Sequence, residues 1–263
     1  MKLKTALLAL AMSSTITAAV NPAFANSKAS DNTLHQYGSP LSLLNKVYEG
    51  DITAAQMVEL GDTGLGTANA MAGELVALDG VVYAINADGS IAEAPADLKA
   101  PYMGMLTFEA SDTVEIDGAH SIQELQSKLA VKMGSENSFY AFKIHGTFPY
   151  LKMASAHKIE DENMALMDYL ATRLMYEKEN VTGTLVGLYT PGYLGNVSIP
   201  GLHFHFLSDK HDLGGHVEDL RFDQQTIQMQ EINQINVSLP KVPKFRKQKL
   251  DMTPAPAATK AAE

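Results

Sequence analysis

The segment of residues 201–216, GLHFHFLSDKHDLGGH, limits the fold of this chain more than any other stretch. In a β-strand alternate side chains lie on one face, so His203 and His205 are expected to project together. Glycine permits tight turns, and a turn at residues 214–215 would bring His216 back beside this pair. The segment therefore predicts two antiparallel strands that gather three imidazoles at one point.

Three converging imidazoles indicate a metal site. Imidazole is the commonest neutral metal ligand, and three histidines with an open fourth position form one of the ligand sets of catalytic zinc. A His-x-His pair alone is more often a hydrated surface feature, but a third histidine favours a metal. His211 competes with His216 for the third position; it lies among charged residues, and we interpret it as a solvated loop residue.

The N-terminus is similar to a secretory signal peptide. Lys2 and Lys4 supply a positive start, the apolar residues 6–12 are too few to span a bilayer, and residues 23–25 (AFA) form a small-x-small cleavage site. We therefore expect residues 1–25 to be removed and the protein to be exported to a periplasm or to the extracellular medium.

The composition narrows the class of partner and ligand. The formal net charge is −10, and removal of Lys2 and Lys4 with the signal peptide would make it −12. Such a surface repels the phosphates of nucleic acids, which argues against them as partners. No second long apolar run follows, so we expect a soluble protein without a membrane span. The chain has no cysteine, so a metal must be held by nitrogen and oxygen ligands.

The first half of the chain predicts short strands and a helix. Asp51 can cap a helix over residues 52–60. Residues 61–67, GDTGLGT, are expected to form a loop; no lysine follows as in a phosphate-binding loop, so a close-packed turn toward a pocket is the preferred interpretation. Asp-Gly between two apolar runs predicts a hairpin over residues 74–85, with another Asp-Gly turn at residues 88–89.

The second half continues this pattern. Ser121 and Glu124 form a capping box that opens a helix. Residues 139–156 predict a long strand bent at Gly146 and Pro149. Further strands are expected at residues 103–108, 113–116, 173–177, 183–189, 217–222 and 226–232, and a further helix at residues 163–172.

The predicted fold class is α+β, in two halves built mainly on antiparallel or mixed β-sheets with a few packed helices. We expect an N-terminal α+β domain over residues 26–138, which includes the strand at 113–116. A C-terminal, β-rich, metal-binding domain is expected over residues 139–263. The metal site would lie on the C-terminal sheet.

Glu74 is a candidate catalytic carboxylate. It opens an apolar strand directly after the glycine-rich segment, where a lone charged side chain needs a partner or a pocket. The alternative is that Glu74 ends a sheet edge in water.

Several ordered segments carry a family resemblance. From about residue 36 to the C-terminus, the chain resembles α-acetolactate decarboxylases, and the spacing from His203 to His216 is part of the likeness. The other segments that carry it are residues 48–51 (YEGD), 61–67 (GDTGLGT), 73–80 (GELVALDG), 87–90 (ADGS) and 143–148 (KIHGTF).

The resemblance implies roles for particular residues. The implied zinc ligands are His203, His205 and His216. Glu74 and a C-terminal glutamate that matches Glu263 would be catalytic, and Thr67 would line the substrate pocket. The implied reaction is decarboxylation of 2-acetolactate, a 2-hydroxy-3-oxo acid, to acetoin and carbon dioxide. Zinc would act as a Lewis acid, the glutamates would manage the proton, and no organic cofactor would be needed. A homodimer is one candidate assembly.

The chain departs from the family pattern at Ala154, where the resemblance places an arginine. Lys152, His157 or Lys158 would have to reach the site instead. A homologue that binds metal and ligand without turnover is therefore the alternative to a working enzyme. A cupin-like metalloenzyme is a third interpretation, but it expects a glutamate four or five residues after His205, where the chain has Asp and Lys.

Overall fold

The computed structural model describes residues 32–252. The predicted signal peptide and Glu263 lie outside this range. The described part has five α-helices and two 3-10 helices, none of which is long and apolar enough to cross a membrane. The helices are α1 (Pro40–Leu44), α2 (Ala54–Leu60), α3 (Ile122–Lys132), α4 (Leu166–Leu170), α5 (Pro243–Lys247), η1 (Asn69–Met71) and η2 (Gly192–Leu194).

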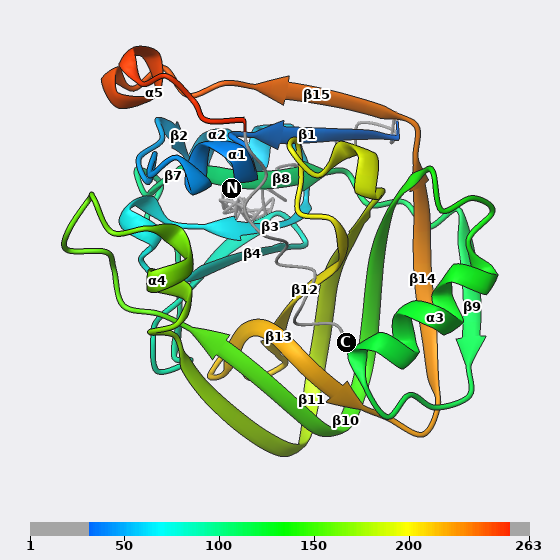
Figure 1. The fold of residues 1–263 in the computed structure, drawn as a ribbon. Helices are drawn as coiled ribbons and strands as arrows, with labels where there is room; N and C mark the ends of the chain where they lie inside the picture. Colours follow the sequence, from blue (N-terminus) through cyan, green and yellow to red (C-terminus); the bar gives the residue numbers. More distant parts are fainter. Residues whose placement is uncertain (1–31, 253–263) are drawn as a thin grey trace, which may run out of the picture.

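Two large sheets form the body of the molecule (Figure 1). The first sheet is seven-stranded with the order β15-β1-β8-β3-β4-β5-β6, and the second is six-stranded with the order β11-β12-β13-β10-β14-β9. The first contains β1 (Thr33–Tyr37), β3 (Thr63–Thr67), β4 (Glu74–Leu78), β5 (Val81–Ile85), β6 (Ile91–Glu93), β8 (Tyr102–Leu106) and β15 (Gln234–Ser238). The second contains β9 (Asp112–Ile116), β10 (Phe139–Ser155), β11 (Leu174–Thr190), β12 (Gly201–Ser208), β13 (Gly214–Arg221) and β14 (Gln225–Ile232). A small pair, β2 (Ile52–Thr53) and β7 (Lys99–Ala100), stands apart. The predicted α+β class is confirmed.

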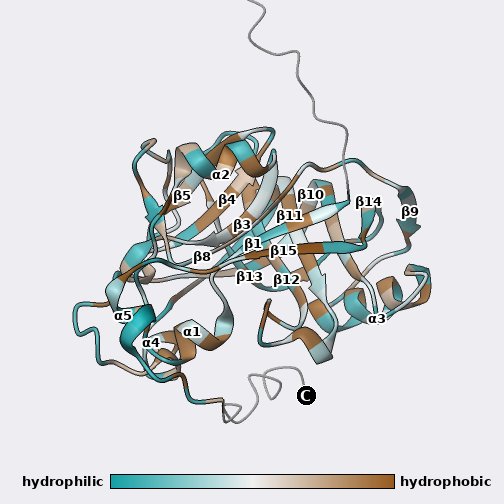
Figure 2. Cartoon of the chain, turned by 90° about the horizontal axis from the view of Figure 1, so that it is seen from above, coloured by the Kyte–Doolittle hydropathy of each residue, from teal (hydrophilic) through white to brown (hydrophobic). Residues whose placement is uncertain are grey.

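The sheets pack face to face, with a helix on each outer side. Val76 and Ile85 of the first sheet share a buried cluster with Val186 and Leu207 of the second. Helix α2 packs through Met57 on the outer face of the first sheet. Helix α3 lies against the second sheet, and Figure 2 shows both hydrophilic and hydrophobic residues along it. The space between the sheets is therefore the place where side chains from both halves of the sequence meet.

The two sheets do not separate at residue 138, where the predicted domain boundary lies. β9 precedes this boundary, yet it pairs with β14 in the second sheet. β15 follows the boundary, yet it pairs in parallel with β1 in the first sheet. The prediction that residues 113–116 extend the N-terminal sheet is wrong, because strand pairing over long sequence distances is not encoded in the local pattern.

The hairpin over residues 74–85 is confirmed. β4 and β5 pair from Glu74 with Ile85 to Leu78 with Val81. Asp79 and Gly80 have φ values of 52° and 82°, as a tight hairpin turn requires.

The glycine-rich segment forms a strand, not the predicted loop. β3 pairs with both β4 and β8. A Cβ atom on Gly64 would lie 2.1 Å from the carbonyl oxygen of Gly104, so the glycines allow β3 and β8 to approach closely. Glycine permits a bend in the chain, and its lack of a side chain also permits close approach of two strands. The second role applies here, and local sequence does not distinguish the two.

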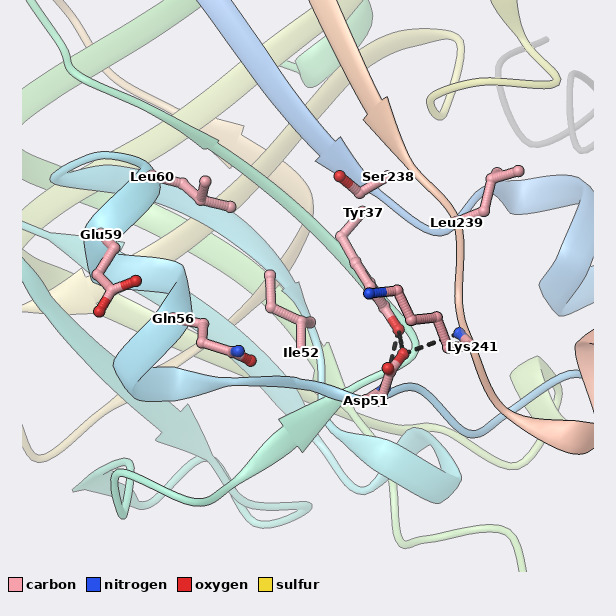
Figure 3. Close-up of a pocket in the computed structure, with 9 residues that line it drawn as sticks. All are labelled: Tyr37, Asp51, Ile52, Gln56, Glu59, Leu60, Ser238, Leu239 and Lys241. Atoms are coloured by element: carbon pink, nitrogen blue, oxygen red, sulfur yellow. Dashed lines mark hydrogen bonds between the residues drawn. The ribbon is translucent and has the colours of Figure 1, made fainter.

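The predicted cap of helix α2 is also corrected. Thr53 caps the helix together with Gln56. The Asp51 carboxylate instead accepts hydrogen bonds from the Tyr37 hydroxyl and the Lys241 backbone amide, which ties the first strand to the C-terminal segment (Figure 3).

Helix α3 begins where predicted, with Ser121 accepting a hydrogen bond from the Glu124 amide at 3.1 Å. The Glu124 carboxylate accepts from the His120 amide instead of completing the capping box. Helix α4 is shorter than predicted. The strands predicted at residues 173–177 and 183–189 are one 17-residue strand, β11, because pairing with the equally long β10 continues across the gap.

Replacement of Phe206 by alanine is expected to lower the free energy of unfolding by about 3–5 kcal/mol. Phe206 is fully buried and packs edge-on against Phe148, with ring centroids 5.9 Å apart. Urea unfolding of both variants in the same buffer would measure the loss. Val131→Ala is the matched control, because Val131 is 83% exposed and its truncation should change stability little. A loss below about 1 kcal/mol would contradict the core assignment.

Candidate metal centre

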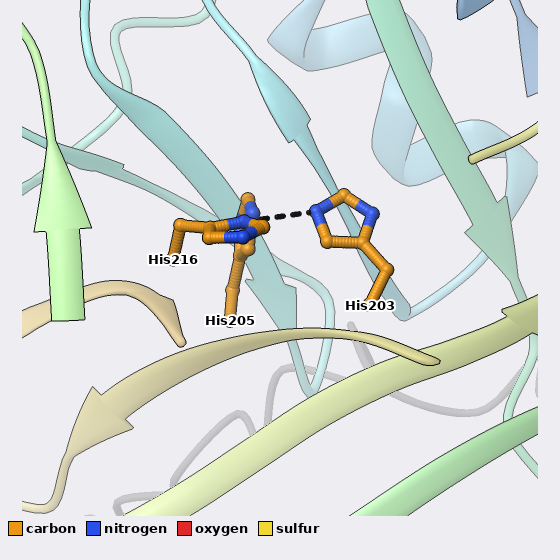
Figure 4. Close-up of side chains that lie close together, drawn as sticks. All are labelled: His203, His205 and His216. Atoms are coloured by element: carbon orange, nitrogen blue, oxygen red, sulfur yellow. Dashed lines mark hydrogen bonds between the residues drawn. The ribbon is translucent and has the colours of Figure 1, made fainter. Parts of the chain in front are cut away.

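The three histidines meet on one face of β12 and β13 (Figure 4). His205 pairs directly with His216 across the two strands, and His203 precedes His205 by two residues on the same face. Their ligand atoms all lie within 4.8 Å of one another. The predicted convergence is confirmed.

The turn that joins these strands lies earlier than predicted. Gly214 and Gly215 belong to β13, and the turn occupies residues 209–213. The Ser208 hydroxyl organises it by accepting from the backbone amides of Asp212 and Leu213. A side-chain cap supplied the turn geometry, so the glycines were not needed for it.

His211 lies in this turn, away from the cluster. Its backbone is left-handed, with φ 52°, and its exposed ring packs 4.7 Å from the ring of Tyr83. The interpretation of His211 as an exposed loop residue is confirmed.

Hydrogen bonding leaves His205 ready to bind a metal. Its Nδ1 lies 2.8 Å from the carbonyl oxygen of Leu75, in β4 of the facing sheet. A carbonyl only accepts, so Nδ1 carries the proton and Nε2 presents its lone pair. Nε2 is buried and has no hydrogen-bond partner within residues 32–252. A buried, bare imidazole nitrogen is what a metal ligand requires, so the residues present fit a metal ion.

Burial keeps the cluster neutral. Desolvation lowers the pKa of His205 to about 4 and lowers the pKa values of His203 and His216 well below their usual range. The neighbouring imidazoles lower the last two pKa values further. Neutral imidazole is the form that coordinates metal, so no proton must be displaced from these ligands at neutral pH. His203 Nε2 and His216 Nδ1 lie 3.1 Å apart.

Glu74 faces the cluster from the first sheet. Its Oε2 lies 3.6 Å from His205 Nε2, and its side chain is 17% exposed. The alternative that Glu74 ends a sheet edge in water is therefore wrong. Burial raises the pKa of Glu74 to about 7, with Arg173 opposing and Glu218 adding to the rise. A carboxyl group with a pKa near neutrality can both take up and release a proton.

Thr67 lies beside Glu74, directly across the β3–β4 pairing. Its buried hydroxyl donates a 2.7 Å hydrogen bond to the carbonyl oxygen of Gly73. This bond uses the only hydroxyl proton and leaves the oxygen able to accept. Its role in substrate binding stays a prediction.

Two residues near the histidines were missed from the sequence. Glu218 shares the site face of β13 with His216, and its Oε1 lies 3.7 Å from His216 Nε2. Arg173 lies just before β11, and its Nη1 forms a 2.6 Å ion pair with the same Oε1. The His-x-Glu spacing could have suggested Glu218. No local pattern could have suggested Arg173, because it lies just before β11, far in the sequence from the histidines.

Ala154 lies directly opposite His216, in the pairing of β10 with β13. Residues directly opposite each other in an antiparallel pair project to the same face, so fully buried Ala154 shares the face of His216. The basic side chains that were expected to take the place of the family arginine lie elsewhere. Lys152 pairs across the strands with acidic residues, and exposed His157 and Lys158 line a surface pocket with Asn86 and Asp88.

The chain matches known proteins over nearly all of its described length. Residues 34–252 match the family model for alpha-acetolactate decarboxylase. The alpha-acetolactate decarboxylase of Methanosarcina mazei is 36% identical over 76% of this chain and 69% of its own length. That of Brevibacillus brevis is 33% identical over 85% of this chain and 79% of its own length.

A solved structure gives the same result. The crystal structure of alpha-acetolactate decarboxylase from Bacillus subtilis strain 168 superposes with a TM-score of 0.80 at 28% identity, covering 83% of this chain and 94% of the other. Fold, motif order and sequence identity agree. The chain therefore belongs to the alpha-acetolactate decarboxylase family.

Proposed function

We propose that this protein decarboxylates 2-acetolactate to acetoin and carbon dioxide at a zinc ion bound by His203, His205 and His216. The observation that carries the proposal is a carboxyl group that faces three clustered imidazoles, of which those of His203 and His205 are buried and that of His216 is partly buried. Glu74 supplies that group at 3.6 Å from His205. Family membership supplies the reaction class.

The reaction needs a place for an electron pair and a source of one proton. When the bond to the carboxylate carbon breaks, carbon dioxide leaves and the bonding pair moves toward the neighbouring ketone, giving an enolate. A bound zinc ion would supply Lewis acidity that stabilises this negative charge. The enolate must then gain a proton on carbon to become acetoin.

Glu74 is proposed to manage this proton. With a pKa near 7, its carboxyl group can hold a proton in the resting protein and release it at a nearby carbon. Thr67 is proposed to accept a hydrogen bond from the substrate hydroxyl. Glu263, which lies outside the described residues, keeps its predicted catalytic role as a proposal.

Zinc is proposed as the metal because three histidines with a fourth position left for substrate form an established zinc site. Imidazole also binds copper, nickel and cobalt, so metal analysis of the purified protein decides the identity. Export, removal of residues 1–25 and assembly as a homodimer are likewise proposals.

The test is an acetoin assay. Purified protein with zinc should release acetoin from 2-acetolactate far above the spontaneous rate, because enzymes usually accelerate reactions by about 10⁶-fold or more. Protein stripped with a chelator is the control, and zinc should restore its activity. Release that stays at the background rate with zinc bound would overturn the proposal and favour a binding protein without turnover.

A further inference from the structure

We propose that Arg173 binds the carboxylate of the substrate and that Glu218 holds its guanidinium in position. The inference rests on the proposed function, because it assigns a site for the group that leaves as carbon dioxide. Arg173 would thereby decide which acids the site accepts.

The position of Arg173 follows from the strand register. Ala154 pairs with Met175 on one side and with His216 on the other. Arg173 precedes Met175 by two residues, so alternation places it toward the face that carries His216. From this position the long side chain reaches Glu218 on β13.

Two contacts fix the guanidinium. Nε donates a 3.2 Å hydrogen bond to the carbonyl oxygen of Leu170, at the end of helix α4. Nη1 pairs with Glu218 at 2.6 Å, and the side chain is 17% exposed. Within residues 32–252 the guanidinium contacts these two acceptors, which leaves three N–H donors, one on Nη1 and two on Nη2. A carboxylate could therefore approach a held donor group.

Charge in the site favours this role. Glu74 and Glu218 both lie beside the histidines, and each would repel a substrate anion if ionised. Arg173 compensates Glu218, and its charge also acts on Glu74. Arg173 therefore places a fixed positive charge against the acidic side of this cluster.

The effect of Arg173 should fall on binding more than on turnover. The carboxylate carries full charge in the bound substrate and loses it as carbon dioxide forms. A contact with that group therefore stabilises the ground state at least as much as the transition state. Its loss is expected to raise KM and to change kcat little.

A stable acid and its neutral counterpart test the proposal. 2,3-Dihydroxy-2-methylbutanoate has the substrate ketone reduced, so it cannot lose carbon dioxide by the same route. Butane-2,3-diol is the same molecule without the carboxylate. Calorimetry on zinc-loaded protein would compare the wild type with Arg173→Gln, Arg173→Lys and Glu218→Gln.

Arg173→Gln should weaken binding of the acid by about 10- to 100-fold and leave binding of the diol unchanged. Arg173→Lys keeps the positive charge but not the planar guanidinium, and it should lose less affinity for the acid than Arg173→Gln. Glu218→Gln should weaken binding of the acid moderately. When Glu218→Gln is already present, adding Arg173→Gln should lower the affinity for the acid by a smaller factor than it does in the wild type. Arg221→Gln is the matched control, since exposed Arg221 stacks on Tyr150 away from the histidines.

The outcomes separate this inference from the proposed function. An acid affinity within about twofold of the wild type in Arg173→Gln, with zinc content retained, would overturn the role of Arg173 even if the wild type releases acetoin. Equal loss of acid and diol binding would also overturn it, because the residue would then act on the whole site. Failure of the wild type to release acetoin would count against the proposed function alone. If Arg173→Gln does not fold, Arg173→Lys replaces it in the test. A lower ratio of acid affinity to diol affinity than in the wild type would support the role of Arg173, and an unchanged ratio would overturn it.

Discussion

His205→Ala is expected to abolish zinc binding. His205 is the central ligand, because it pairs with His216 across the strands and follows His203 on the same face. Its Nδ1 bond to Leu75 fixes both the ring orientation and the tautomer. Loss of a contact that only orients a ligand typically costs 10- to 100-fold in metal affinity, so loss of the ligand itself should cost more than about 100-fold.

Metal content after dialysis, measured by mass spectrometry, checks this result. His211→Ala is the matched control, because His211 belongs to the same hairpin but lies in the exposed turn. It should retain the zinc of the wild type. Unchanged zinc in His205→Ala would refute the ligand assignment, and loss of zinc in both variants would point to the hairpin instead of the imidazole.

Glu74→Gln is expected to lower kcat by about 10²- to 10⁴-fold while zinc remains bound. Glutamine keeps the size of the side chain and its place beside His205, but it cannot exchange a proton near neutral pH. The histidine contacts with Leu75 and between His203 and His216 do not involve Glu74, so the metal ligands should stay in place.

Acetoin release and zinc content, measured on the same preparation, separate chemistry from metal binding. Glu93→Gln removes an exposed carboxylate from the same sheet and should leave both unchanged. An active Glu74→Gln variant would remove Glu74 from the proton-transfer step. A variant that is inactive and also free of zinc would show that Glu74 supports the metal, not the proton.

Family membership changes how two alternatives stand. The cupin-like interpretation is replaced, because the family match covers residues 34–252. The alternative of an inactive homologue rested on alanine at position 154. In the structure, Arg173 forms an ion pair with Glu218, two residues from His216, and no family comparison supports loss of activity.

Some errors in the sequence-based predictions share one cause. Glycines at Gly64 and Gly66 suggested a loop, and those at Gly214 and Gly215 suggested a turn, yet all four lie in strands. Glycine allows a bend, and it also allows close packing of neighbouring atoms. A Cβ atom on Gly215 would lie 2.4 Å from the Tyr176 hydroxyl, a residue that only the folded chain brings there.

The sequence alone determined that His203 and His205 share a face, because the two-residue period of a strand fixes which side chains project together. It also predicted that His216 joins them, but the turn that brings His216 opposite His205 lies earlier than the sequence indicated. It also determined the hairpin of β4 and β5, because turn chemistry acts between adjacent residues. The tertiary structure decided the rest of the site. The bond from His205 to Leu75 joins residues 130 positions apart, and the approach of Glu74 depends on the same packing of one sheet on the other. Such contacts follow from how two apolar faces fit together, which no local period encodes.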